Sequence, residues 1–150
     1  LLSFPDSWIA VAFLHANNNT SNDEQISRLK SLAALSSDSS FVMLNINRYK
    51  PEVKFPDGET YGAYMSAIEH SVGAIGGSVL WRVPVQGSVV GDLEEFDEVM
   101  AVWYPSHQAF LDLPDADRAR EMFRYRRVCV EKAHIVELSD QSPSLRPFGS

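Results

Sequence analysis

Arg126 is the residue of this sequence best placed to bind an anion. The spacing predicts a helix over residues 115–127 whose apolar face holds Met122 and Phe123, and Arg126 follows these two on the same face. An arginine that faces a core must pair with a carboxylate or bind a ligand anion. We therefore expect either a buried ion pair, with Asp97 as one candidate partner, or an anchor for a carboxylate or enolate oxygen of a substrate.

Two residues are candidates for moving a proton. Asp97 opens a predicted strand over residues 96–104, where its carboxylate could act as a general base. The alternative is that Asp97 pairs with Arg48 or Arg126, or caps a turn. His107 follows Ser106, which can cap a helix that runs to about residue 113, and its ring could reach a cleft from there.

Further polar and aromatic residues could line a substrate pocket. Asn45 and Arg48 lie on the predicted strand 41–48, and strand alternation directs them to opposite faces, so we do not expect them to contact one ligand. Tyr64, Trp81 and Tyr104 are candidate pocket walls, although aromatic residues also fill cores. The aromatic content makes an apolar or aromatic ligand more plausible than a sugar or a phosphate.

The histidines do not form a metal-binding pattern. None has the His-x-x-x-His spacing of a zinc site, so we predict no metal and no cofactor. A haem with one axial histidine, His107 or His134, stays open as an alternative. Gly76 and Gly77 end a predicted helix rather than open one, which argues against a phosphate-binding loop.

Composition limits the class of protein and its partners. A chain of 150 residues with 45% hydrophobic residues is the size of one domain with a core of its own. The net charge of −7 argues against nucleic acid as a partner. The apolar run at residues 8–14 is too short to cross a membrane. Cys129 is the one cysteine, which excludes an intrachain disulfide and favours a reducing, cytoplasmic location, and its apolar neighbours indicate a core position.

The hydrophobic periodicity gives the order of the elements. We expect an N-terminal arm over residues 1–19, a domain over 20–138 and a C-terminal tail over 139–150. Within the domain the pattern predicts a leading helix at 22–35, capped by Thr20 or Ser21. It predicts strands at 41–48, 79–90, 96–104 and within 130–138, with a bulge or turn at 84–87 in the second of them. Three further helices are predicted at 61–75, 106–113 and 115–127. From residue 41 this is β-α-β-β-α-β, an α+β ferredoxin-like fold with a four-stranded antiparallel sheet and an extra N-terminal helix.

One face of such a sheet is left uncovered by its two helices. Strand alternation leaves open which residues face away from the helices, but both choices place large apolar residues there. One choice gives Phe41 and Met43, and the other gives Val99, Ala101 and Trp103. A two-fold dimer whose sheets face each other would bury them, so we expect a homodimer.

A series of short matches resembles a known family. The matching residues, spread over about residues 20–138, are Met43-Leu44-Asn45, Arg48, Gly62-Ala63-Tyr64, Gly76-Gly77 with Leu80-Trp81, Phe96-Asp97, Tyr104-Pro105-Ser106 with Ala109-Phe110, and Arg126. In this order they resemble the domain of unknown function 1330 family, within the dimeric α/β-barrel superfamily. The resemblance implies a homodimer of ferredoxin-like protomers with a cleft between sheet and helices or within the barrel.

The same resemblance gives a class of function but no reaction. The superfamily includes cofactor-free monooxygenases, lactone isomerases, haem-handling enzymes and stress proteins. This chain departs from the family pattern at Tyr125, where the family usually has His, and at Ala133-His134, where it usually has Ser-Arg. Our leading hypothesis is a metal-free enzyme acting on a small apolar or aromatic carbonyl or enol-type substrate. The alternatives are a non-catalytic small-molecule-binding or structural dimer, and a haem-binding protein.

Overall fold

The computed structural model describes residue 19 and residues 21–140 of the chain. Most of the predicted N-terminal arm and of the C-terminal tail therefore lies outside the described residues. Within them, the leading helix α2 covers Asp23–Ala33. Its cap is Asn22 and not Thr20 or Ser21, because the Asn22 side chain accepts a hydrogen bond from the Gln25 backbone while the Gln25 side chain reaches back to the Asn22 backbone.

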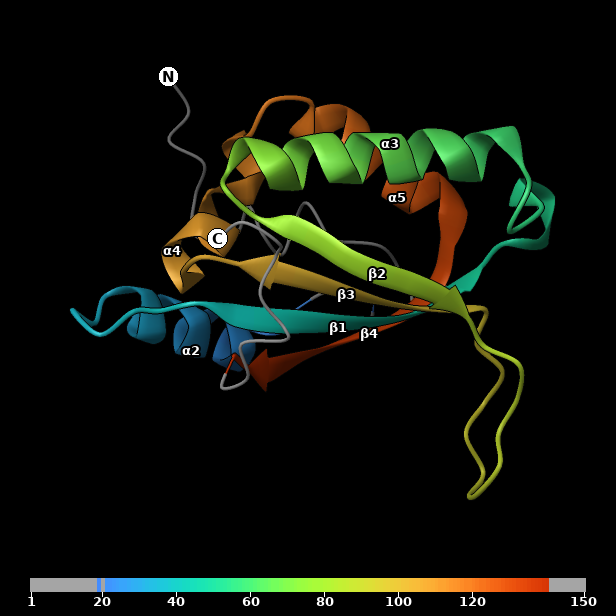
Figure 1. Ribbon diagram of the computed structural model, residues 1–150, viewed down its shortest axis with the longest axis horizontal. Coiled ribbons are helices and arrows are strands. Elements are labelled where there is room, and N and C mark those ends of the chain that lie inside the picture. The colour runs from blue at the N-terminus through green and yellow to red at the C-terminus, as the bar shows by residue number, and fades with distance from the viewer. Residues whose placement is uncertain (1–18, 20, 141–150) are drawn as a thin grey trace.

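The centre of the fold is one antiparallel sheet in the order β2-β3-β1-β4. Its strands are β1 Phe41–Tyr49, β2 Ser78–Pro84, β3 Glu98–Tyr104 and β4 Val130–Ser139. Helices α3 (Glu59–Ala74) and α5 (Ala119–Cys129) lie side by side over one face of this sheet (Figure 1). The short helix α4 (His107–Asp112), capped by Ser106 as expected, packs against α2, and 3-10 turns cover Pro51–Val53 and Leu113–Asp115. This is the ferredoxin-like α+β fold that the sequence predicts.

The periodicity of α3 explains how the covered face is filled. Its buried residues include Tyr61, Tyr64, Met65, Ile68 and Val72, which is the stripe predicted from the sequence. The helix ends before two glycines that other residues could replace only with strain. Gly76 has a φ of +83°, and a Cβ on Gly77 would lie 2.9 Å from the backbone oxygen of Trp103.

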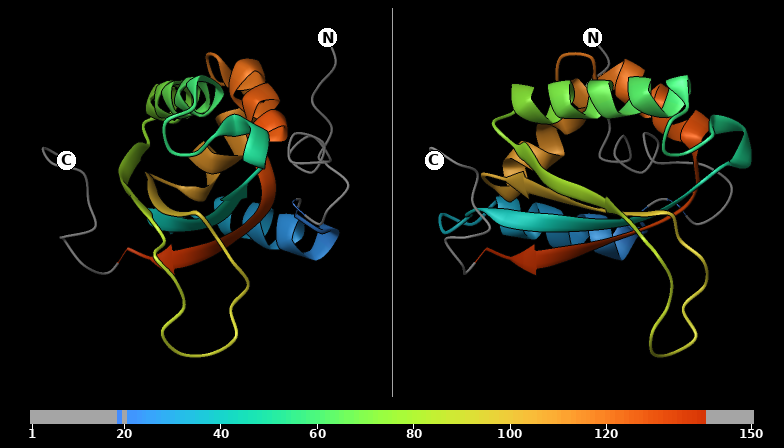
Figure 2. Two further views of the ribbon diagram at one scale, coloured as in Figure 1. Left: turned by 90° about the vertical axis from the view of Figure 1, so that its right-hand side faces the viewer. Right: turned by 45° about the vertical axis from the view of Figure 1, so that its right-hand side comes forward.

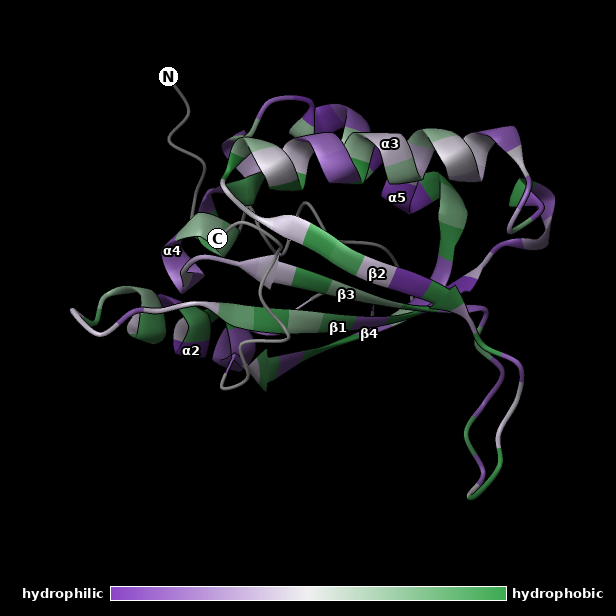
Figure 3. Cartoon of the chain, in the orientation of Figure 1, coloured by the Kyte–Doolittle hydropathy of each residue, from purple (hydrophilic) through white to green (hydrophobic). Residues whose placement is uncertain are grey.

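Strand register decides which residues face the helices. Phe41, Met43 and Asn45 lie on the covered face of β1, since the first two belong to the buried core and Asn45 lines a cavity together with residues of α3 and α5. The uncovered face of β3 therefore carries Val99, Ala101 and Trp103, the second of the two sets expected above. The adjacent strands continue this apolar face with Trp81, Val83, Val136 and Leu138, all of them exposed. Figure 3 shows the hydrophobic stretches along β1, β2 and β3.

The predicted strand 79–90 is wrong in its second half. Strand β2 ends at Pro84, and residues 85–97 form a long loop that projects away from the helix-covered face (Figure 2). Proline has no N–H for the ladder, and Gly87 and Gly91 both have positive φ, so the chain turns here. The irregularity in pairing lies between Val79 and Trp81 and not at 84–87.

The segment that leads to Arg126 also differs from its prediction. Residues 113–115 form a 3-10 turn at Pro114, and α5 starts only at Ala119, after Arg118 in a left-handed conformation (φ 61°). The helix continues to Cys129, which is fully buried, and burial raises the pKa of its thiol to about 11. This agrees with a core role for Cys129. No helix among residues 21–140 is long and apolar enough to cross a membrane.

Candidate binding and proton-transfer site

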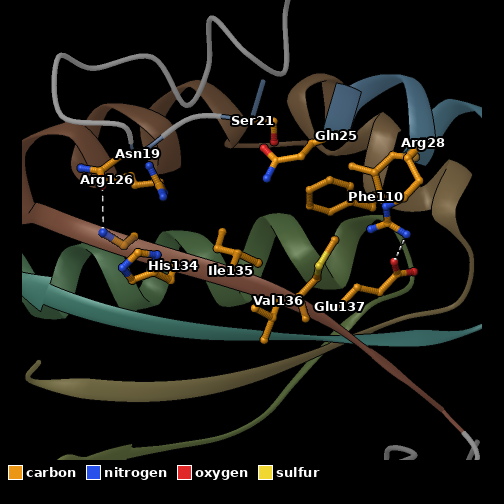
Figure 4. Close-up of a pocket in the computed structure, with 13 residues that line it drawn as sticks. Asn19, Ser21, Gln25, Arg28, Phe110, Arg126, His134, Ile135, Val136 and Glu137 are labelled. Carbon is orange, nitrogen blue, oxygen red and sulfur yellow. Dashed lines mark hydrogen bonds and ion pairs between the residues drawn. The ribbon is translucent and has the colours of Figure 1, made fainter. Parts of the chain in front are cut away.

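A cavity of about 320 Å³ lies between α2, α5 and the outer strand β4. In Figure 4, Gln25 and Arg28 of α2 lie across this cavity from Ile135, Val136 and Glu137 of β4. Its lining comprises Asn19, Ser21, Gln25, Arg28, Leu29, Met43, Phe110, Arg126, Ala133, His134, Ile135, Val136 and Glu137. The lining is therefore mixed, with apolar residues from α2, β1, α4 and β4 beside polar and charged residues from α2, α5 and β4.

Arg126 provides the buried positive charge of this cavity. Only 8% of Arg126 is exposed, and its guanidinium is hydrogen-bonded to the Tyr64 hydroxyl. Burial lowers the pKa of the guanidinium, and burial also raises the pKa of the Tyr64 phenol to about 12. Near neutral pH the Tyr64 phenol is therefore neutral. The guanidinium still carries its charge in surroundings that screen it weakly.

Several predicted site residues meet around Arg126. A smaller space of about 30 Å³ continues from the cavity beneath α5, and Asn45, Tyr64 and Tyr104 line it together with Arg126. The Asn45 amide donates to the backbone oxygen of Met43 over 3.3 Å. Met43, Phe110 and Ile135 border both spaces. The structure thus brings together four of the residues that the sequence singled out, from β1, α3, β3 and α5.

His107 lies between two carboxylates at the edge of the cavity. Its Nδ1 is 2.7 Å from Asp38 Oδ1, and its Nε2 hydrogen-bonds to Glu137 Oε1. Arg28 Nη1 lies 2.6 Å from the other Glu137 oxygen. The ring of Phe41 stacks on the imidazole at 4.2 Å, with only 6° between the planes. His107 is itself 8% exposed and meets the cavity through Glu137, which lines it.

The carboxylates of this cluster are held in their ionised form. Burial alone would raise the pKa of Asp38, but hydrogen bonds from His107 and from the Gln108 backbone outweigh it and hold the pKa below the ordinary 3.8. Burial would likewise raise the pKa of Glu137, and the contacts with His107 and Arg28 lower it below 4.5.

Sequence reasoning missed Glu137, Asp38 and Arg28. For Glu137 a signal existed, because alternation along β4 places it on the same face as Ala133 and Ile135, opposite Met43 of β1. A carboxylate on that face needs partners, and the contacts with His107 and Arg28 supply them.

Besides His107, three predicted site residues lie outside the lining of both spaces. Asp97 Oδ2 accepts a hydrogen bond from the Tyr49 backbone N–H over 2.7 Å, an anchor for the loop before β3. Arg48 Nε lies 2.9 Å from Glu131 Oε2. Trp81 is 44% exposed and pairs with Ala101 on the uncovered face of the sheet.

A second polar cluster surrounds Glu98, the neighbour of Asp97. Glu98 is 2% exposed, and the hydroxyls of Tyr49 and Tyr61 donate to its two oxygens, the former over 2.7 Å. Arg82 Nη1 donates to the Tyr61 hydroxyl over 2.9 Å. The cluster forms the floor of an open groove between the start of α3 and the end of β2. Its contacts tie β1, β2, β3 and α3 together, which is a structural role.

The two histidines considered for haem are already engaged. Coordination through His107 would break a hydrogen bond to a carboxylate at either ring nitrogen. His134 Nε2 lies 3.9 Å from Glu94, and its ring packs edge-on against Phe96. Within the described residues no group of three or more His, Cys, Asp or Glu side chains is arranged to hold a metal ion.

Comparison with known proteins supports the fold and gives no activity. No family profile matches the chain, and no curated protein matches it. The structure is similar to that of a protein of unknown function from Rhodopseudomonas palustris, with 25% identity and a TM-score of 0.66 over 82% of this chain and 96% of that one. The methylated form of the same protein gives a TM-score of 0.67.

A third structure gives the fold a name. A dabb family protein with a ferredoxin-like fold from Mesorhizobium loti is 12% identical, with a TM-score of 0.50 over 69% of this chain and 99% of that one. At this identity the likeness concerns the fold alone.

Proposed function

We propose that the cavity between α2, β4 and α5 binds a small aromatic or apolar carbonyl compound and catalyses a proton transfer on it without a metal. The observation that carries this proposal is that a buried guanidinium, Arg126, and an ionised carboxylate, Glu137, both line one cavity of mixed polar and apolar character. Figure 4 shows the two residues toward opposite ends of that cavity.

Arg126 would bind the anionic end of the ligand. A guanidinium presents several N–H donors in one plane, which suits a carboxylate or an enolate oxygen. Leu29, Phe110 and Ile135 offer apolar contact to a ring or short chain beside it. A volume of about 320 Å³ is at the lower end for ligand pockets, which favours a small molecule.

Glu137 would take the proton. In an enolisation its carboxylate removes a hydrogen from the carbon next to the carbonyl, the C–H electrons form a C=C bond, and the carbonyl oxygen becomes an enolate stabilised by Arg126. If the hydrogen on the protonated Glu137 exchanges with solvent before the proton returns to the same carbon, the net result is hydrogen exchange. If the proton goes instead to the enolate oxygen, the net result is isomerisation to the enol. His107 takes part through its hydrogen bond to Glu137. Asp97, which anchors a loop elsewhere, has no part in this scheme.

We also propose that the protein is a homodimer formed through the uncovered face of its sheet. The support is the apolar character of that face, where Trp81, Val83, Val136 and Leu138 are each between 38% and 48% exposed. Membership of the domain of unknown function 1330 family belongs to the same proposal. It is supported by the spaced residue matches, while the ferredoxin-like neighbour supports the fold alone. A cytoplasmic location would suit the buried thiol of Cys129.

Phenylpyruvate is a suitable probe of the reaction, because it combines a carboxylate, an aromatic ring and an exchangeable C–H next to a carbonyl. Proton NMR in D₂O follows the loss of its C3 hydrogens. We expect the protein to accelerate this exchange, and Glu137→Gln to lower the acceleration by about 10²- to 10⁴-fold. Glu121→Gln is the matched control, since Glu121 lies on the surface of α5 and pairs with Arg118.

The outcome separates the enzyme from the non-catalytic alternative. Exchange no faster than in buffer, in a protein that binds phenylpyruvate, would show a small-molecule-binding protein and overturn the catalytic proposal. If Glu137→Gln and Glu121→Gln lowered the exchange rate equally, Glu137 would not be the residue that takes the proton.

A further inference from the structure

Asp38 connects to the cavity through His107, although it lies in the loop between α2 and β1. One of its oxygens accepts from the His107 backbone N–H (2.9 Å) and contacts the ring Nδ1 (2.7 Å), and the other accepts from the Gln108 backbone N–H (3.1 Å). These contacts fix both the start of α4 and the orientation of the imidazole. Phe41 stacks flat on the ring and restricts its rotation further.

Hydrogen-bonding chemistry limits how one imidazole can contact two carboxylates. An ionised carboxylate oxygen only accepts, so an imidazole held between two carboxylates satisfies both contacts only when both ring nitrogens carry a proton. Asp38, His107 and Glu137 then form a chain of two charge-assisted hydrogen bonds, with a cation between two anions.

We propose that Asp38 and His107 are positioning residues for Glu137: Asp38 keeps the imidazole doubly protonated, and the imidazolium holds the Glu137 carboxylate ionised and aimed into the cavity. The purpose of this arrangement rests on the proposed function. The arrangement itself, the chain Asp38–His107–Glu137 that we call the relay, exists without any ligand. It assigns Asp38 a role in the site although Asp38 does not line the cavity.

Other charged groups also act on Glu137 from the elements around it. Arg28 of α2 pairs with its second oxygen, and Arg126 of α5 and His134 of β4 line the same cavity. Arg28 holds Glu137 in parallel with His107, so removing His107 weakens the hold on Glu137 without abolishing it. The relay is distinguished from simple pairing by Asp38, which acts on Glu137 only through His107.

The test is a pH titration of Glu137 by carbon NMR of its side-chain carboxyl, in the protein without ligand. We expect His107→Gln to raise the pKa of Glu137 by about one unit and Asp38→Asn to raise it by about half a unit. Asp112→Asn is the matched control. Asp112 lies at the end of α4, the helix that begins at His107, and its carboxylate accepts a hydrogen bond from the Gln108 side chain over 2.9 Å. A folded Asp38→Asn protein with a wild-type Glu137 titration would overturn the relay.

A second measurement covers the case in which Asp38→Asn fails to fold. Nitrogen NMR of the His107 ring in the wild-type protein near neutral pH should show both ring nitrogens protonated, and one unprotonated nitrogen would overturn the proposal. Neither readout needs turnover. The relay can therefore fail while the cavity still binds phenylpyruvate, and it can hold in a protein that proves non-catalytic.

Discussion

Replacing Arg126 by Met separates an anion-binding role from a purely structural one. Methionine keeps much of the side-chain volume and removes the charge. A charge-assisted hydrogen bond to a bound carboxylate contributes about 1.5–3 kcal/mol, so benzoate, a ligand that cannot enolise, should bind about 10- to 150-fold more weakly.

Stability should change much less. Among the contacts of Arg126 with the described residues, losing the Tyr64 hydroxyl costs about 1 kcal/mol and the removal of a largely buried charge offsets it, so these contacts should change the free energy of unfolding by about 1 kcal/mol or less.

The two effects are measured on the same variants. Calorimetry with benzoate gives the affinity and urea denaturation gives the stability. Arg124→Met is the matched control, since Arg124 is exposed on the same helix and packs over Tyr125. A loss of about 3 kcal/mol or more in stability, with benzoate affinity unchanged, would refute the reasoning and make Arg126 part of a structural ion pair.

Three further predictions concern the structure around the site. Glu98→Gln should lower the free energy of unfolding by about 1–3 kcal/mol in urea denaturation without changing benzoate affinity, because it replaces a carboxylate that two tyrosines hold, and a loss of affinity would contradict a structural role. The pKa of Glu137 is lowered by folding, so its stabilising contribution is present above the ordinary pKa of 4.5 and is lost as the pH falls through the lower folded value. Melting temperatures between pH 7 and pH 3 should therefore fall less in His107→Gln than in the wild type, and parallel curves would contradict this. The wild type should have a mass in solution of about 34 kDa, twice the 16.8 kDa of one chain, and Trp81→Glu should give the monomer, whereas a wild-type monomer would exclude the dimer.

The fold followed from the sequence wherever periodicity was long and regular. The apolar stripe of α3 and the glycines after it set the helix and its end, and alternation on β1 separated Asn45 from Arg48 correctly. The prediction failed at residues 85–90, where apolar residues resemble a strand by composition. There the missing N–H of Pro84 and the positive φ of two glycines decide the outcome.

The site was predictable in part, for a physical reason. Arg126, Asn45, Tyr64 and Tyr104 could be proposed from the sequence because each interrupts or completes a core face within its own element. The structure places all four around one space, and their role in binding stays a prediction. The relay was not, because Asp38, His107 and Glu137 lie on three separate segments, and only tertiary packing brings them together. Periodicity within one element carries no information on such contacts.

The central claim, that the cavity beside Arg126 receives a small anionic molecule, is tested most directly by a crystal structure of the protein grown with benzoate. We predict electron density for benzoate in the cavity between α2, β4 and α5, with its carboxylate within hydrogen-bonding distance of the Arg126 guanidinium and its ring against Phe110 and Ile135. A structure in which benzoate is absent from that cavity, while Arg126 pairs with a carboxylate of the protein itself, would contradict the claim.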